Sequence, residues 1–139
     1  MDGAFLKAAL RAKGIDRSIL VTDAVMPAGC APGPYMLGEV EVELKPDQSV
    51  VLRGGTRLAG SALKMHRAIS NVVRLAGVTL REAITMATIN PARVGRIPYR
   101  VRGFTPGQRS DVVVFRRMDD GAIQVLETWL DGRHVFQAA

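Results

Sequence analysis

Apolar residues recur at helical spacing from the first residues of the chain onward. Over residues 2–13, Asp2 stands where a helix N-cap is expected and Gly14 where a helix ends. Four apolar residues fall on one face of this segment, namely Phe5, Leu6, Ala9 and Leu10. The pattern predicts an amphipathic helix.

A short continuous apolar run follows at Ser18–Asp23 and ends in polar residues. Such a run is typical of a strand buried on both faces, as in a parallel sheet covered by helices. A helix that feeds a buried strand is half of a repeating βα unit. The start of the chain therefore predicts an α/β fold.

The next segment changes from apolar runs to turn residues and then to alternation. Residues 24–34 hold three prolines and two glycines without a period, which predicts a loop. Glu39–Leu44 alternates strictly, Pro46 and Asp47 signal a turn, and Ser49–Leu52 starts a return strand. We expect a β-hairpin insertion at about residues 35–58.

Helical periodicity returns at residues 63–76, where Gly77 stands at the expected end. Thr79 and Glu82 match a capping box for a short helix. Asn90 and Pro91 read as an N-cap and first-turn proline of another. The middle of the chain is therefore expected to be three successive helices.

The chain changes character at about Ile97, where prolines and glycines precede further strand-like segments. Three strands are predicted, over residues 110–116, 122–130 and 134–137, with tight turns at 119–121 and 131–132. We therefore expect two parts, an α/β part over residues 1–96 and a small antiparallel β domain over residues 97–139.

Composition places the chain among globular proteins. It has 139 residues, 47% of them hydrophobic and 23% charged. The single cysteine, Cys30, cannot form an internal disulfide, and no signal-like apolar stretch follows Met1, so we expect a cytoplasmic setting. The longest apolar runs are far shorter than the roughly 20 residues of a membrane span.

The net charge of +6 comes from fifteen arginines and four lysines against thirteen acidic residues. A basic balance can signal nucleic-acid binding. The arginines are spread along the chain, however, and few aromatic residues accompany them, which argues against a base-stacking surface. The densest cluster is Arg93, Arg96, Arg100, Arg102 and Arg109. We expect no nucleic-acid partner.

Two segments are candidates for chemistry. Asp23 ends the predicted buried strand, where α/β folds place ligands, although it could instead cap the loop by accepting backbone hydrogen bonds. Leu58–Ser61 is expected to be a small-residue loop before a helix, which could present backbone N–H groups and a hydroxyl to an anion or sugar. Ser61 could equally be the N-cap of that helix.

The remaining reactive side chains do not assemble a site in the sequence. A histidine-rich catalytic metal site needs three convergent protein ligands, and His66 and His134 are remote from each other. Cys30 has no histidine nearby to activate it as a nucleophile.

Taken together, the motifs resemble the amidohydrolase superfamily and, within it, the N-acetylglucosamine-6-phosphate deacetylase family. The matching segments follow in the family's order: Ser18–Ala24, Pro27–Gly29, Leu58–Ser61, Met86–Arg93 and Pro106–Val114. By this resemblance the fold is the last βα unit of a TIM-type barrel with the inserted hairpin, followed by helices and part of a small antiparallel β-sandwich.

The resemblance also implies roles. Asp23 would be the general base that deprotonates a metal-bound water and later protonates the leaving amine, and it is a possible secondary metal ligand. The four residues that would line the sugar site are Leu58, Ala59, Gly60 and Ser61. The family's divalent metal, which we take to be zinc, is held by a glutamate and histidines from earlier barrel strands. No such ligands lie in this chain.

The resemblance therefore implies a C-terminal segment of an amino-sugar-phosphate deacetylase that lacks activity alone. We expect a homo-oligomer, or a companion chain that carries the rest of the barrel. A non-catalytic binding or structural module derived from that fold is one alternative. Another is a different amidohydrolase, similar to dihydroorotases or adenine deaminases, although the Leu58–Ser61 segment argues against it.

Overall fold

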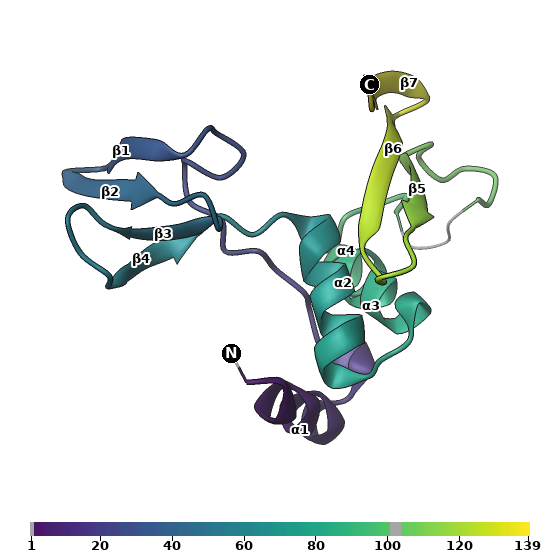
Figure 1. Ribbon diagram of the computed structural model, residues 1–139. Coiled ribbons are helices and arrows are strands. Elements are labelled where there is room, and N and C mark those ends of the chain that lie inside the picture. The colour runs from purple at the N-terminus through teal and green to yellow at the C-terminus, as the bar shows by residue number, and fades with distance from the viewer. Residues whose placement is uncertain (1, 101–103) are drawn as a thin grey trace. The chain divides into compact units, whose positions relative to one another are not determined.

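A computed structural model of the chain describes residues 2–100 and 104–139 (Figure 1). Arg102 of the predicted arginine cluster lies outside them. Their helices and strands are α1 Gly3–Lys13, the 3-10 turn η1 Ile15–Arg17, β1 Gly33–Leu37, β2 Val40–Leu44, β3 Ser49–Leu52, β4 Leu58–Ser61, α2 Met65–Ala76, α3 Leu80–Ala87, α4 Ile89–Val94, β5 Val112–Arg117, β6 Ile123–Leu130 and β7 Arg133–Gln137. No helix of this described part is long and apolar enough to cross a membrane.

Packing divides the chain into two compact units. The first, here called the helical unit, comprises Met1–Leu20 and Ile69–Ala139; the second, the meander unit, comprises Val21–Ala68. Each has a hydrophobic core made of its own residues. The predicted boundary between residues 96 and 97 stays a prediction.

The meander unit is a four-stranded antiparallel sheet in the order β1-β2-β3-β4. The predicted hairpin is confirmed as β2 paired with β3, with Val42 opposite Leu52 and Leu44 opposite Val50. The turn between them is held by Asp47, whose carboxylate accepts hydrogen bonds from Ser49 N at 2.9 Å and Ser49 Oγ at 2.7 Å. Val42, Leu44 and Val50 are fully buried in the core.

Two further strands flank the hairpin, and they correct the sequence prediction. Leu58–Ser61, expected as a loop, is strand β4, and β1 starts at Gly33 inside the predicted loop. Small residues carry little strand signal of their own. Here the backbone of β4 pairs with β3, so tertiary pairing outweighs composition.

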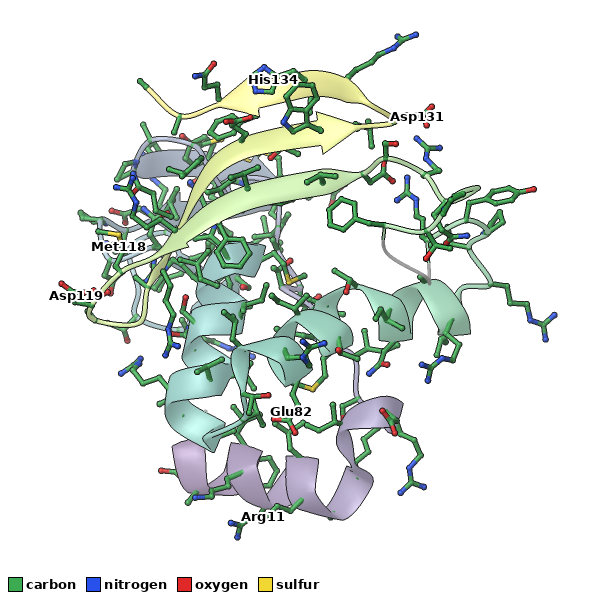
Figure 2. The ribbon with its side chains drawn as sticks, turned by 90° about the vertical axis from the view of Figure 1, so that its right-hand side faces the viewer. Arg11, Glu82, Met118, Asp119, Asp131 and His134 are labelled. Atoms are coloured by element: carbon green, nitrogen blue, oxygen red, sulfur yellow. The ribbon has the colours of Figure 1, made fainter. Side chains whose placement is uncertain are left out.

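The helical unit begins as the sequence predicts. The Asp2 carboxylate accepts hydrogen bonds from the backbone N–H groups of Ala4 at 2.8 Å and Phe5 at 3.2 Å, and Gly14 ends α1. The capping box is also confirmed, because the Glu82 carboxylate accepts from Thr79 N at 2.7 Å and the Thr79 hydroxyl accepts from Glu82 N at 3.2 Å. Figure 2 labels Glu82 in the first turn of α3.

Buried apolar residues from α2 and α3 form the core of the helical unit: Val72, Ala76, Ala83 and Met86. Leu6 and Leu10 of α1 pack against them, whereas Phe5 and Ala9 of the predicted apolar face are exposed. The order of these helices confirms the predicted helical middle of the chain.

The predicted cap at Asn90 is wrong. Helix α4 starts at Ile89, so Asn90 lies inside it, and its side chain is 1% exposed. Thr88 takes the N-cap position. The amide of Asn90 bonds to residues far away in the sequence, which local capping rules do not consider.

The three C-terminal strands form an antiparallel sheet in the order β5-β6-β7, as the sequence predicts. Figure 2 shows Asp119 and Asp131 at its two opposite ends, in the predicted turns. Asp111, just before β5, accepts a hydrogen bond from Asp131 N at 2.8 Å and forms an ion pair with Arg100 at 2.8 Å. The motif aspartate at position 111 therefore stabilises the β6–β7 turn.

The predicted strand over residues 18–23 is wrong. No strand within the described part of the chain pairs with it, and Ile19 and Val21 are 38% and 64% exposed. A continuous apolar run is typical of a strand covered on both sides, and coverage needs neighbouring strands. The segment is extended without such neighbours here.

Candidate functional site

Asp23 lies on the surface of the meander unit in an unusual backbone conformation. Its φ is +50°, in the left-handed region, which aspartate adopts more readily than most residues. The residue is exposed. A left-handed residue at the end of an extended segment turns the chain sharply and leaves the carboxylate accessible.

The chain after Asp23 joins the edge of the meander sheet. Ala24 forms a parallel bridge with Ser61, and Val25 N donates a hydrogen bond to Ser61 O at 2.9 Å. Ser61 is the last residue of β4, the segment predicted to bind sugar. Asp23 directly precedes Ala24, the residue that contacts Ser61. Two candidates 38 positions apart in the sequence are thereby brought together.

Strand β4 carries an irregularity at this place. Gly60 stands opposite Val50, and Leu58 stands opposite Val51, so Ala59 is an extra residue in β4. A bulge of this kind bends an edge strand and redirects its side chains, and bulges are frequent beside functional sites.

The close approach of the two segments requires a glycine. A Cβ built on Gly60 would lie 2.7 Å from Val25 Cγ2 and 2.8 Å from Val25 Cγ1, inside van der Waals contact. The side chain of Val25 therefore occupies the space that any larger residue at position 60 would need.

The other two members of the candidate sugar segment differ in exposure. Leu58 is 71% exposed, whereas Ala59 packs against the core. The Ser61 hydroxyl accepts a hydrogen bond from Leu63 N at 3.1 Å. Because α2 starts at Met65, Ser61 caps a turn before the helix, and the alternative that it is the helix N-cap is wrong.

The arrangement offers a carboxylate, an exposed apolar side chain and a hydroxyl along one strand edge. The charges of the meander unit balance, with five basic and five acidic side chains, so the excess of +6 lies in the helical unit. A carboxylate on an accessible turn can take up a proton from water or from a bound molecule.

Metal-ligand geometry is not found in the described residues 2–100 and 104–139, where no three histidine, cysteine, aspartate or glutamate side chains converge. His66 lies on α2, where burial first, and then the charges of Lys64 and Arg67, lower its pKa. His134 of β7 lies 3.7 Å from the Glu127 carboxylate, and its ring centroid is 4.6 Å from that of Trp129. A metal at Asp23 would need ligands from elsewhere.

Sequence reasoning did not anticipate a hollow of about 380 Å³ in the helical unit. Arg100 and Asp111 flank it with their ion pair. The lining also includes Thr88, Pro91, Ile97, Tyr99, Phe104 and Val112. Pro91 belongs to α4 and Val112 to β5, and the others lie in irregular segments, which carry no periodic signal.

Comparisons with known proteins point in one direction. No family model matches the chain. The "Putative N-acetylgalactosamine-6-phosphate deacetylase" of Escherichia coli K12 is 36% identical over 118 residues, which cover 85% of this chain and 67% of that protein. The N-acetylglucosamine-6-phosphate deacetylase of Vibrio furnissii is 35% identical over 123 residues, or 88% of this chain and 29% of that protein.

This chain is also similar to a solved structure. The N-acetylglucosamine-6-phosphate deacetylase of Thermotoga maritima superposes with a TM-score of 0.80 at 29% identity, covering 98% of this chain and 36% of the other. The chain thus spans about two thirds of one relative and about a third or less of the other two.

Proposed function

Because this chain belongs to the N-acetylglucosamine-6-phosphate deacetylase family, we propose that it supplies the general base and part of the sugar site for removing an N-acetyl group from an amino-sugar 6-phosphate. The observation that carries the proposal is the bridge between Ala24 and Ser61, which holds Asp23 beside strand β4.

Asp23 is the proton carrier of the proposed reaction. Its carboxylate accepts a proton from the water whose oxygen attacks the acetyl carbonyl carbon. When the C–N bond breaks, the same proton passes to the departing nitrogen, so acetate and the free amino sugar phosphate leave. An exposed carboxylate at a tight turn suits this role, because it can reach a substrate without first breaking contacts of its own.

Strand β4 is the proposed sugar contact. The exposed face of Leu58 offers an apolar surface for the ring, and the Ser61 O–H can donate a hydrogen bond to a sugar oxygen. Gly60 keeps the strand close to Val25 and therefore close to Asp23. The identity of the sugar, gluco or galacto, is part of what the experiment below decides.

The family's divalent metal, zinc by resemblance, would polarise the acetyl carbonyl when bound. The described residues do not form a site for it. We therefore propose that ligands come from a companion segment carrying the rest of the barrel, or from a further copy in a homo-oligomer. Exposed apolar side chains in the helical unit support association, among them Phe104 at 93%, Val113 at 52% and Val135 at 56% exposure.

The test is an acetate-release assay on the purified protein with zinc, alone and together with any companion segment that its coding region provides. Substrates are N-acetylglucosamine 6-phosphate, N-acetylgalactosamine 6-phosphate and unphosphorylated N-acetylglucosamine. The proposal expects turnover of a phosphorylated sugar only with the companion segment or in an oligomer. Binding of these sugars without turnover in every assembly would favour the non-catalytic module.

A further inference from the structure

The hollow in the helical unit has the size of a small-molecule site and takes no part in the proposed reaction. Its volume of about 380 Å³ lies within the roughly 300–1,000 Å³ of known ligand pockets. The residues that line it come from segments 87–100 and 104–112, all of which belong to the helical unit. Asp23 belongs to the meander unit. The hollow is therefore a candidate site of its own.

Most of its wall is apolar. Ala87 contributes from the end of α3, Pro91 and Ala92 from α4, and Val112 from the start of β5. Ala92 is buried, whereas Ile97, which also lines the hollow, is 43% exposed. A wall of this kind favours a ligand with an apolar body, because contact removes apolar surface of both partners from water.

The polar side of the hollow carries two guanidinium groups and one carboxylate. Arg100 Nη2 lies 2.8 Å from Asp111 Oδ2, and Arg109 Nε lies 3.5 Å from the same oxygen. Arg109 N also donates to Tyr99 O at 2.8 Å, which joins the backbones that carry the two arginines. A guanidinium has five N–H donors, so each arginine keeps donors beyond the one that faces Asp111. With 38% of each arginine side chain exposed, a ligand can reach these donors.

The charges of this cluster favour a ligand with a single negative charge. Two guanidinium groups and one carboxylate leave a net charge of +1, which one further carboxylate neutralises. A phosphate monoester carries about −2 at pH 7 and would leave an excess of negative charge. Asp131 also lies 3.8 Å from Arg109, but 66% of its side chain is exposed, so water weakens this contact.

We propose that the hollow binds a small carboxylic acid with a flat apolar body. Its carboxylate accepts hydrogen bonds from Arg100 and Arg109, and its body lies against α4 and Val112. Carboxylates suit this position because a guanidinium can donate two parallel N–H bonds to one carboxylate. The proposal adds a second site to the chain and does not depend on Asp23 or on deacetylation.

The test is an NMR titration of the ¹⁵N-labelled 139-residue chain with two probes. These are 2-naphthoate and 2-naphthamide, which share an apolar body and differ in charge. Amide signals of Ala87, Ala92 and Val112 should shift on binding, while those of Val42 and Leu44 in the meander core stay in place. The chain should bind 2-naphthoate at least about tenfold more tightly than 2-naphthamide, because only the carboxylate forms charge-assisted hydrogen bonds.

Arg100→Met separates recognition of the carboxylate from contact with the apolar body. Methionine keeps an apolar stem and removes the guanidinium, so affinity for 2-naphthoate should fall by about tenfold and affinity for 2-naphthamide should stay the same. Arg93→Met is the matched control. It changes the net charge of the chain by the same amount, but Arg93 is exposed on α4 and does not line the hollow. It should leave both affinities unchanged.

A second variant keeps the ion pairs of the cluster intact. Ala87→Leu adds bulk to the apolar wall and leaves the contacts between Arg100 and Asp111 in place, so it should weaken binding of both probes by a similar factor. The spectrum of each variant without probe shows whether the fold is kept. If Arg100→Met does not fold, Ala87→Leu and the comparison of the two probes decide the matter.

Three results would overturn the proposal. Equal affinities of the parent chain for the two probes would mean that the guanidinium groups do not recognise the carboxylate. Equal losses in Arg93→Met and Arg100→Met would indicate attraction by net charge alone. Undiminished binding by Ala87→Leu, or shifts spread over both units, would place the probes outside the hollow. Because none of these readouts involves turnover, failure of this proposal and failure of the proposed function are distinguishable.

Discussion

Gly60 and Val25 approach each other so closely that the Cβ of any other residue at position 60 would meet Val25 Cγ2 at 2.7 Å. The contact joins strand β4 to the residues that directly follow Asp23. Both partners are neighbours of the bridge between Ala24 and Ser61. The geometry of the candidate site therefore depends on the absence of a side chain.

Gly60→Ala is expected to destabilise the meander unit. Forcing a methyl group into a filled space costs about 1–3 kcal/mol. Circular dichroism in urea measures the change, with Gly55→Ala as control, since a Cβ at Gly55 would meet nothing nearer than Leu52 O at 3.6 Å. Equal midpoints for the two variants would show that β4 has room to move away.

Val25→Ala should partly rescue Gly60→Ala. Removing both Val25 Cγ atoms empties the space that the new methyl group needs. The double variant should then lose less stability than the sum of the two single variants, by about 0.5–3 kcal/mol in a double-mutant cycle. Strict additivity would mean that the two side chains do not meet.

Glu82 makes the capping box sensitive to pH. The hydrogen bond from Thr79 N, and next the one from the Thr79 hydroxyl, lower the pKa of the Glu82 carboxyl. Because the folded pKa lies below the unfolded value of about 4.3, this contribution to stability is present above that value and is lost as pH falls through the lowered folded pKa.

Glu82→Gln removes the titration. The parent chain should therefore have a higher urea midpoint than Glu82→Gln at pH 7, and this difference should be smaller at a pH below the unfolded pKa of about 4.3. The fluorescence of Trp129, the single tryptophan, follows unfolding of the helical unit. If the two urea midpoints differed by the same amount at both pH values, the lowered pKa of Glu82 would not be the cause of the difference.

The separate cores predict separate responses to cavity mutations. Leu44→Ala empties part of the meander core, where Leu44 is fully buried, and should cost about 2–5 kcal/mol there. Exchange of β2 and β3 amides should speed up, while the urea midpoint of Trp129 fluorescence stays unchanged. Met86→Ala, in the core of the helical unit, should lower the urea midpoint of Trp129 fluorescence and leave the exchange of the β2 and β3 amides unchanged. A common shift of both probes would show that the two units unfold as one.

The sequence predicts local features of this fold well. The Asp2 cap, the Thr79–Glu82 capping box and the Asp47 turn each depend on residues within four positions of one another, and all three are confirmed. The alternating pattern of Glu39–Leu44 likewise predicts β2, and segments bounded by turn signals predict β3 and the C-terminal sheet. In these places propensity and packing agree.

Features that depend on distant partners could not be read from local patterns. The apolar run over residues 18–23 predicts a covered strand, but whether a strand forms depends on neighbours. Asn90 looks like a helix cap because a proline follows it. Its side chain instead bonds to residues more than 70 positions away, which no local pattern reveals. Leu58–Ser61 looks like a loop because most of its residues are small. It forms a strand because its backbone pairs with β3.

The candidate site shows the same division. The sequence indicates Asp23 and Leu58–Ser61 separately, each with a structural alternative of equal standing. Their contact through Ala24 and Ser61 is visible only in three dimensions.

The most direct test of the account is the kcat of Asp23→Asn in the active assembly, with its preferred amino-sugar phosphate as substrate. Asparagine keeps the size of the side chain but cannot take the proton, so kcat should fall by about 10²- to 10⁴-fold with KM little changed. Asp119→Asn, in the exposed turn between β5 and β6, is the matched control and should keep full activity. A kcat for Asp23→Asn equal to that of the control would contradict the central claim.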